Sequence, residues 1–237
     1  MLKNLLLLDI ETIPQLEDYD LLPYSWQILW LDKISKTVPE NTAPKESYRQ
    51  RAGILAEFGK IVCISTAFFY DDANKKTSLK VKSIYNTDEK ELLQTFIMLC
   101  NKVFNRNPQF QFAGHNIREF DIPYICRRMI INNIPLPEYL SIHEKKPWEV
   151  KMFDTLNFWK FGDHKNYISL HLLANVLDLP TSKTDMDGSM VQDVYYKEKN
   201  LRRIADYCER DVILTANIIL KFINFPILED SSVITVP

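Results

Sequence analysis

The pattern of apolar and polar positions predicts five β-strands. In residues 5–13 four leucines precede Asp-Ile-Glu-Thr-Ile, so acidic and apolar side chains alternate at the end of a buried strand. Residues 60–70, rich in β-branched and aromatic side chains, and residues 78–85 are expected to form a hairpin. Residues 110–115 and 151–155 complete the set of strands.

Helical periodicity predicts the elements that flank these strands. Apolar residues recur three and four apart in residues 88–104, and Asp88 is a helix-start signal. Further helices are expected over residues 122–132, 168–177 and 201–223. Strands with helices mixed in later along the chain are typical of an α/β domain with a mixed sheet. We therefore interpret residues 1–237 as a single domain.

Residues 14–58 differ in character from the rest of the chain. Four prolines punctuate this polar stretch, which predicts short helices and loops inserted into the domain. Trp26 and Trp30 are four residues apart and would share one helical face. Packing in a core is favoured over base stacking for this pair.

Composition narrows the functional class. The chain carries 29 Lys and Arg against 31 Asp and Glu, a net charge of −2, which excludes a strongly basic nucleic-acid coat protein. Its five glycines show no dinucleotide-binding or P-loop spacing. Its four cysteines form no CxxC pair and are expected to be buried in a reducing compartment. The N-terminal apolar run ends at Asp9, too short for a signal peptide or a membrane span, so we expect a cytoplasmic protein without a membrane partner.

Three groups of acidic residues stand out. Asp9 and Glu11 are two apart on a strand, so their carboxylates share a face where a divalent cation would offset their repulsion; hydration at the strand end is the alternative. Asp121 follows a strand-to-helix loop, where a helix N-cap is an equal alternative. Tyr207 and Asp211 are four apart on one helical face, which is also common on solvated surfaces.

The order and spacing of these groups resemble the three motifs of DEDD 3′–5′ exonucleases, in the version of the proofreading domain of family B DNA polymerases. The motifs read DIET at 9–12, NxxxFD at 116–121 and YxxxD at 207–211. The segments SLHLLANVLDLP, DMDGSMV and YCERDVILT resemble stand-alone bacterial relatives of that domain. One branch has a histidine five residues before the last aspartate. Here Asp206 stands at that position, and Tyr207 matches the tyrosine branch, DEDDy.

This resemblance implies a ribonuclease-H-like fold, with a central mixed five-stranded sheet flanked by helices. It implies that Asp9, Glu11, Asp121 and Asp211 hold two divalent cations, Mg²⁺ or Mn²⁺. Tyr207 would orient the attacking water, so these five residues would form the catalytic set. His115 is not the expected base and is interpreted as a structural histidine at a strand end.

The resemblance also suggests substrate contacts. Thr12 and Asn116 would touch the terminal nucleotide, and Lys183 would lie near the phosphate. Phe120 would pack against the base or sugar, with a place in the core as an equal alternative. Three arginines are further candidates for nucleic-acid contacts, namely Arg118, Arg127 and Arg128.

We therefore expect a metal-dependent 3′–5′ exonuclease that hydrolyses phosphodiester bonds at the 3′ ends of single-stranded or frayed DNA by a two-metal-ion mechanism. A 3′–5′ exoribonuclease stays open as an alternative, because no residue recognisably reads a 2′-hydroxyl. A non-catalytic nucleic-acid-binding module on the same fold is the other alternative. We expect no polymerase in cis within 237 residues, and an unidentified protein partner in repair or replication stays open.

Overall fold

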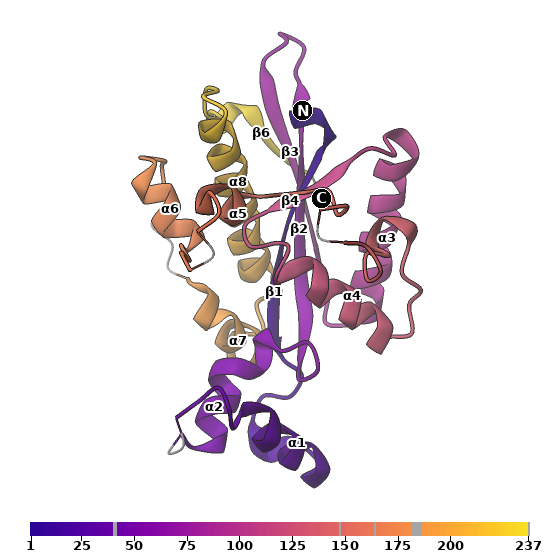
Figure 1. Ribbon diagram of the computed structural model, residues 1–237, viewed down its shortest axis with the longest axis vertical. Helices are drawn as coiled ribbons and strands as arrows, with labels where there is room; N and C mark the ends of the chain where they lie inside the picture. Colours follow the sequence, from indigo (N-terminus) through magenta and orange to yellow (C-terminus); the bar gives the residue numbers. More distant parts are fainter. Residues whose placement is uncertain (40–41, 147, 164, 182–185, 237) are drawn as a thin grey trace.

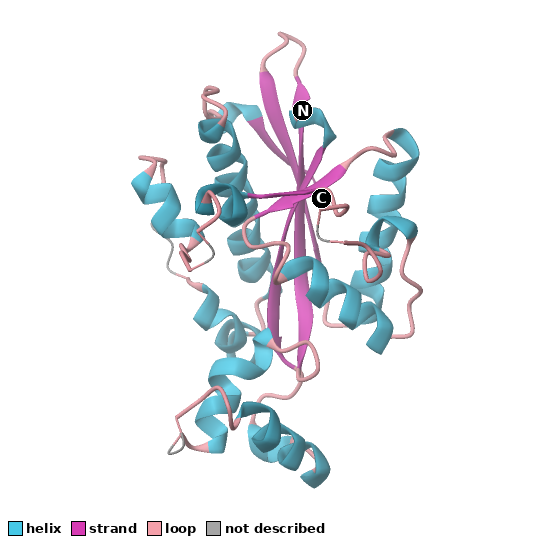
Figure 2. Cartoon of the chain, viewed as in Figure 1, coloured by secondary structure: helices cyan, strands magenta, loops and turns pink. Residues whose placement is uncertain are grey.

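A mixed β-sheet runs through the centre of the computed structural model, which describes residues 1–39, 42–146, 148–163, 165–181 and 186–236 (Figures 1 and 2). The strand order is β5-β4-β1-β2-β3-β6. β1 is antiparallel to β2, and β2 to β3, whereas β4, β5 and β6 join their neighbours in parallel. The strands are β1 (Leu5–Pro14), β2 (Gly59–Asp71), β3 (Thr77–Tyr85), β4 (Gln111–Gly114), β5 (Met152–Asp154) and β6 (Val233–Val236).

The predicted α/β architecture with a helix-flanked mixed sheet is confirmed, but the described sheet has six strands rather than five. The additional strand, β6, lies at the sheet edge beside β3. Its four residues are too few to show a period along the sequence. They form a strand because β3 offers its open side for parallel pairing from Leu79 to Lys82.

The pleat of β1 decides which way its carboxylates face. Leu6, Leu8 and Ile10 belong to the core cluster beneath α3 (Glu89–Arg106) and α4 (Asp121–Ile131). Leu5 and Leu7 pack on the other side, beneath α8 (Leu201–Phe222). Since side chains alternate along a strand, Asp9 and Glu11 lie on the α8 face.

The short length of β4 leaves an opening in the middle of the sheet. β4 pairs with β1 only from Leu5 to Leu7, so the rest of β1 has no partner strand on that side within the described part of the chain. β4 ends at Gly114, where a Cβ would lie 2.9 Å from the backbone oxygen of Leu8. Glycine therefore lets the chain leave the sheet while still in close contact with β1.

Helix α3 begins where the sequence predicts it. The side chain of Asp88 caps α3 by accepting hydrogen bonds from the backbone N–H groups of Lys90 and Glu91, at 2.8 and 3.1 Å. The predicted helix at 168–177 is α6 (Leu170–Val176), and two short helices, α5 (Thr155–Lys160) and α7 (Val191–Asp193), precede and follow it. No helix in the described ranges is both long enough and apolar enough to cross a membrane.

Residues 14–58 contain short helices and loops, as expected, and α1 (Tyr24–Ile34) and α2 (Pro44–Arg51) lie together at the lower end of the sheet in Figure 1. Trp30 is fully buried and packs edge-on against Tyr48 and Phe58, with ring centroids 5.1 and 5.0 Å away. Its predicted place in a core is confirmed. Trp26 is 40% exposed and contacts the same Phe58.

Candidate active site

The structure brings together the five residues predicted as the catalytic set. Asp9 and Glu11 project from β1 toward α8, where Tyr207 and Asp211 lie one helical turn apart. Asp121 is the first residue of α4, and its Oδ1 accepts a hydrogen bond from the backbone N–H of Ile10 at 3.1 Å. This N–H points into the opening beyond the end of β4. The carboxylates thus reach one place from three separate segments.

Burial and mutual repulsion dominate the electrostatics of this cluster. Burial raises the pKa values of Asp9 and Glu11 well above their ordinary values, and the charges of neighbouring carboxylates raise them further. Asp121 and Asp211 repel Asp9, and Asp9 and Asp211 repel Glu11. Burial raises the pKa of Asp121 to about 7, with the backbone N–H of Ile10 opposing the change. Four acids therefore share a site where ionising all of them is costly.

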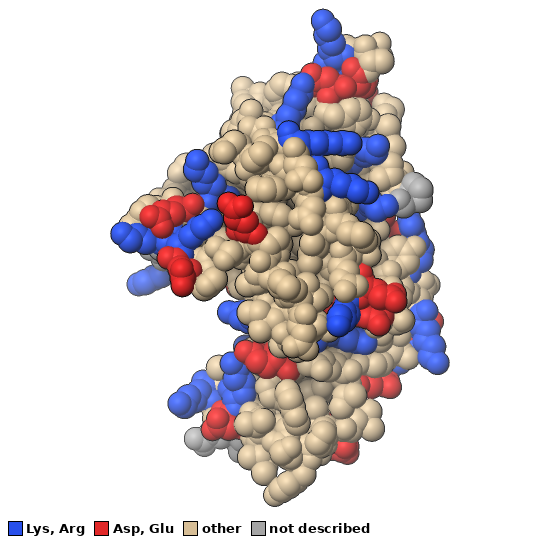
Figure 3. All heavy atoms as spheres, turned by 90° about the vertical axis from the view of Figure 1, so that its right-hand side faces the viewer, with Lys and Arg blue, Asp and Glu red and all other residues tan. Residues whose placement is uncertain are grey.

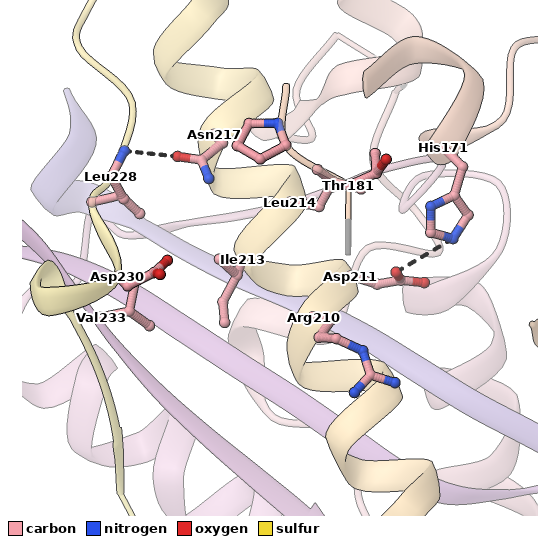
Figure 4. A pocket seen from close by; sticks show the side chains of 11 residues that line it. His171, Thr181, Arg210, Asp211, Ile213, Leu214, Asn217, Leu228, Asp230 and Val233 are labelled. Atoms are coloured by element: carbon pink, nitrogen blue, oxygen red, sulfur yellow. Dashed lines mark hydrogen bonds and ion pairs between the residues drawn. The ribbon is translucent and has the colours of Figure 1, made fainter. Parts of the chain in front are cut away.

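Little positive charge balances this cluster within the described residues. No lysine or arginine of that part of the chain forms an ion pair with Asp9, Glu11, Asp121 or Asp211. The Nε2 of His171 lies 3.7 Å from Oδ1 of Asp211 (Figure 4). The pKa of Asp211 is raised by burial, and His171, the Tyr207 hydroxyl and the charge of Arg210 oppose that change.

The donor atoms of the site fit a divalent cation. Asp9, Glu11 and Cys208 each offer one ligand atom, and these atoms lie within 4.8 Å of one another. Carboxylate oxygens are the ligands that Mg²⁺ and Mn²⁺ prefer. The Sγ of Cys208 lies 3.3 Å from Oδ2 of Asp9 and donates a hydrogen bond to it. A cation would supply positive charge directly between these acids, with which no lysine or arginine of the described residues forms an ion pair.

Tyr207 is held as a neutral phenol. It is buried, and its pKa is raised by that burial and by the charges of Asp211, Glu11 and Asp9. Tyr207 stands one helical turn before Asp211 on α8, and Asp211 is the carboxylate that raises this pKa most. Such a hydroxyl can orient a neighbouring group by hydrogen bonding without carrying a charge itself.

His115 has the structural role expected of it. Its Nδ1 lies 2.9 Å from the Thr155 hydroxyl, and its Nε2 lies 3.0 Å from the backbone oxygen of Ile168. Burial lowers its pKa, so the ring is held neutral between two loops.

A buried aspartate outside the predicted set positions the loop that carries Asp121. Both carboxylate oxygens of Asp154 accept backbone N–H groups of this loop, from Asn116 at 3.1 Å and Arg118 at 3.0 Å. Asn116 has φ +60°, a left-handed conformation that asparagine tolerates better than most residues. The same aspartate caps α5. Its only signal in the sequence is an aspartate directly before a short helix.

His171 is a second residue that the sequence did not identify. It lies on α6 and faces Asp211 across a pocket of about 360 Å³, which Thr181 and Arg210 also line (Figure 4). In the sequence it stands 40 positions from Asp211 with no spacing rule to connect them. Only the packing of α6 against α8 brings the two side chains together.

The residues predicted to contact the substrate lie in different places in the structure. Thr12 and Phe120 line an open groove of about 670 Å³ together with Glu11, and residues of α2 form its far wall. Phe120 is half-buried and packs on Tyr124, with ring centroids 5.4 Å apart. Asn116 is half-buried in the loop and is not part of this groove. Lys183 lies outside the described residues.

The three arginines predicted as nucleic-acid contacts also differ in their surroundings. The prediction that Arg128 contacts nucleic acid is wrong, because its side chain is buried in an ion pair with Glu89 at 2.5 Å. Burial of a charge requires such a partner, which removes the guanidinium from the surface. Arg118 donates from Nη2 to the backbone oxygen of Val150 at 2.7 Å. Arg127 is exposed on α4.

Comparison with known proteins adds to this geometry. The chain matches a family described as "Predicted 3'-5' exonuclease related to the exonuclease domain of PolB" over residues 54–228, a range that includes Asp121, Tyr207 and Asp211 but begins after Asp9 and Glu11. No curated protein sequence matches the chain.

Among solved structures, the family B DNA polymerase of the hyperthermophilic archaeon Pyrobaculum calidifontis has a similar fold, with a TM-score of 0.57. The similarity covers 93% of this chain and 24% of the polymerase at 13% sequence identity, so the chain spans about a quarter of that polymerase's length. The likeness agrees with the ribonuclease-H-like exonuclease fold expected from the motifs. Because the family match extends over well more than half of the sequence, the chain belongs to the family of predicted 3′–5′ exonucleases related to the exonuclease domain of PolB.

Proposed function

We propose that this chain is a metal-dependent 3′–5′ exonuclease that removes nucleotides from the 3′ ends of single-stranded or frayed DNA. One observation supports this above all. Four carboxylates and a tyrosine meet beside an open groove, and no lysine or arginine of the described residues forms an ion pair with those carboxylates. Family membership supplies the reaction class, and the DNA strand is the substrate by analogy with the polymerase domain.

The four acids of the site would serve as cation ligands. Asp9, Glu11, Asp121 and Asp211 would hold two divalent cations, Mg²⁺ or Mn²⁺. Bound cations of this kind stabilise the charge that develops on a phosphoryl group and lower the pKa of water. Asp121 is fixed by the backbone of β1, so its carboxylate needs little reorganisation on binding.

The remaining residues would position the water and the strand. The Tyr207 hydroxyl, beside Asp211 on α8, would orient the attacking water by a hydrogen bond. Thr12 and Phe120 would contact the terminal nucleotide from the groove beside Glu11. Phe120 packs on Tyr124, which keeps its ring in a fixed place at the groove.

A cleavage assay tests the proposal directly. Single-stranded DNA and RNA labelled at the 5′ end are incubated with the protein and Mg²⁺ or Mn²⁺. We expect a ladder of products shortened one nucleotide at a time from the 3′ end, with DNA degraded faster than RNA. Asp9→Asn should abolish the ladder, because it removes one charge from the cation site while keeping the shape of the side chain.

A matched variant separates this effect from a general loss of charge. Asp206 lies on the exposed side of α8 and pairs with Arg202 at 2.7 Å. Asp206→Asn should leave the ladder unchanged. Full activity of Asp9→Asn would reject the site, and faster degradation of RNA would reassign the substrate. If no strand is cut with either metal, the chain is a binding module.

A further inference from the structure

A second charged surface lies on the sheet face opposite the carboxylates. Phe68 on β2 is paired with Lys80 on β3, and Lys82 follows two residues later on the same side. The intervening residues Leu79 and Val81 pack beneath α8, so Lys80 and Lys82 point toward the side of α3. Helix α3 covers only part of this face, and Phe68 is 41% exposed.

These side chains border a groove of about 290 Å³ between the sheet and α3, which we name the basic groove. Its floor is apolar and includes Leu6, Leu99 and Phe110. Among the described residues, no acidic side chain lines it. Figure 3 shows blue side chains gathered on the upper part of this face, with red ones only at their borders. The cations of the basic groove are Lys3, Lys80, Lys82, Lys102 and Arg106.

The charge of the basic groove is only partly balanced by the ion pairs of the described residues. Lys3 pairs with Asp71 at 2.6 Å, a contact between exposed side chains. In the described ranges, Lys80, Lys102 and Arg106 have no ion pair. The whole chain has a net charge of −2, so this concentration of cations is a local feature contributed by three separate segments. Such a surface attracts a ligand with several negative charges.

The apolar floor and the aromatic ring favour one class of polyanion. Surfaces that bind single-stranded nucleic acid combine cations along the backbone path with aromatic rings on which bases stack. A nucleic-acid strand offers a planar base for Phe68 at every position, whereas a peptide made of acidic residues alone would use the cations and offer no ring. We infer that the basic groove binds a single-stranded segment of nucleic acid, as a second contact separate from the carboxylate site. The ligand class rests on the proposed function.

Binding without cleavage tests this inference. The probe is a fluorescein-labelled single strand of about 20 nucleotides, longer than one such binding site, and fluorescence anisotropy is measured in EDTA at several salt concentrations. We expect Lys80→Glu/Lys102→Glu to weaken binding about tenfold or more and to reduce the salt dependence, since each lost phosphate contact removes about 0.7 from the slope. Phe68→Leu should weaken binding severalfold with the salt dependence unchanged, because it removes the ring and no charge.

A control with the same change of charge decides between local and general effects. Lys90 lies on α3 about 18 Å along the helix from Lys102, and Lys221 lies on α8 at the other side of the sheet. Lys90→Glu/Lys221→Glu should bind the strand as the wild type does. If both double variants lose the same affinity, or neither loses any, the inference is overturned. Lys102→Glu alone, on an exposed helix position, replaces the double variant if that protein does not fold.

Two further measurements complete the test. A polyglutamate peptide of the same length should compete poorly for the labelled strand, and equal competition would reassign the groove to acidic peptides and overturn the inference. With Mg²⁺, Lys80→Glu/Lys102→Glu should cut a trinucleotide at the wild-type rate and the long strand more slowly. If the wild type cuts neither substrate, the exonuclease proposal is rejected. The binding measurements in EDTA test the basic groove independently of that result.

Discussion

The Asp121→Asn substitution removes one negative charge from the carboxylate cluster with little change of shape. An asparagine Oδ1 can still accept the hydrogen bond that the backbone N–H of Ile10 donates to Asp121. Burial raises the pKa of this carboxyl from its ordinary 3.8 to about 7. One pKa unit corresponds to about 1.4 kcal/mol, which gives roughly 4 kcal/mol as the upper limit for the cost of ionising Asp121 in the folded, metal-free protein.

The direction of the pH dependence follows from the raised pKa. The folded chain holds this proton more tightly than the unfolded chain does, so the added stability is complete below about pH 4 and is lost as the pH rises through about 7. In EDTA we expect wild type and Asp121→Asn to have similar free energies of unfolding near pH 4, at about the unfolded pKa. Near pH 8 the variant should be more stable by a few kcal/mol, about 2 to 4, in urea denaturation.

Divalent cations should reverse this order. Mg²⁺ at neutral pH should raise the free energy of unfolding of the wild type more than that of Asp121→Asn, because binding to the folded state alone stabilises it. Asp154→Asn serves as the control, since Asp154 is also buried but accepts hydrogen bonds from four backbone N–H groups. That variant should be less stable by about 1 to 3 kcal/mol. A destabilised Asp121→Asn protein near pH 8 in EDTA would refute the reasoning.

Three further substitutions have defined outcomes. Tyr207→Phe should lower kcat about ten- to a hundredfold with unchanged circular dichroism, and equal rates would contradict a role in orienting water. Arg128→Ala should lower the free energy of unfolding by about 3 to 5 kcal/mol in urea, because it leaves the carboxylate of Glu89 buried without its ion-pair partner. Gly59→Ala should lower the melting temperature by several degrees, because its Cβ would lie 2.7 Å from the backbone oxygen of Gly53; an unchanged melt would show that the loop yields.

Most of the framework could be predicted from residue patterns because it rests on local periodicity. The acidic-apolar alternation after Leu8 marks the end of β1, and the helical period after Asp88 marks α3. β6 could not be found in this way, because four residues carry no period and their strand depends on pairing with β3. The strand conformation of β6 depends on this tertiary contact, as is common for short strands.

In the candidate site, too, some residues could be predicted from sequence patterns and others could not. The two-residue and four-residue spacings place Asp9 with Glu11 and Tyr207 with Asp211 on shared faces. The resemblance to the exonuclease motifs is what selects them as a site, and their catalytic roles stay predictions. Two positions had no comparable signal, because Asp154 and His171 act through contacts 36 to 40 residues away in sequence. Arg128 was misread for a related reason: a charged residue on an amphipathic helix looks exposed until its buried partner, Glu89, is seen.

The early end of β4 has a consequence for strand pairing between molecules. An unpaired strand edge in the interior of a sheet could accept a strand from a second molecule, which is a common route to aggregation. On β1 this edge begins after Leu7, and the carboxylate of Asp121 takes the N–H of Ile10 that an incoming strand would need. The residue expected to hold a cation therefore also blocks strand addition along the part of β1 that β4 does not pair with.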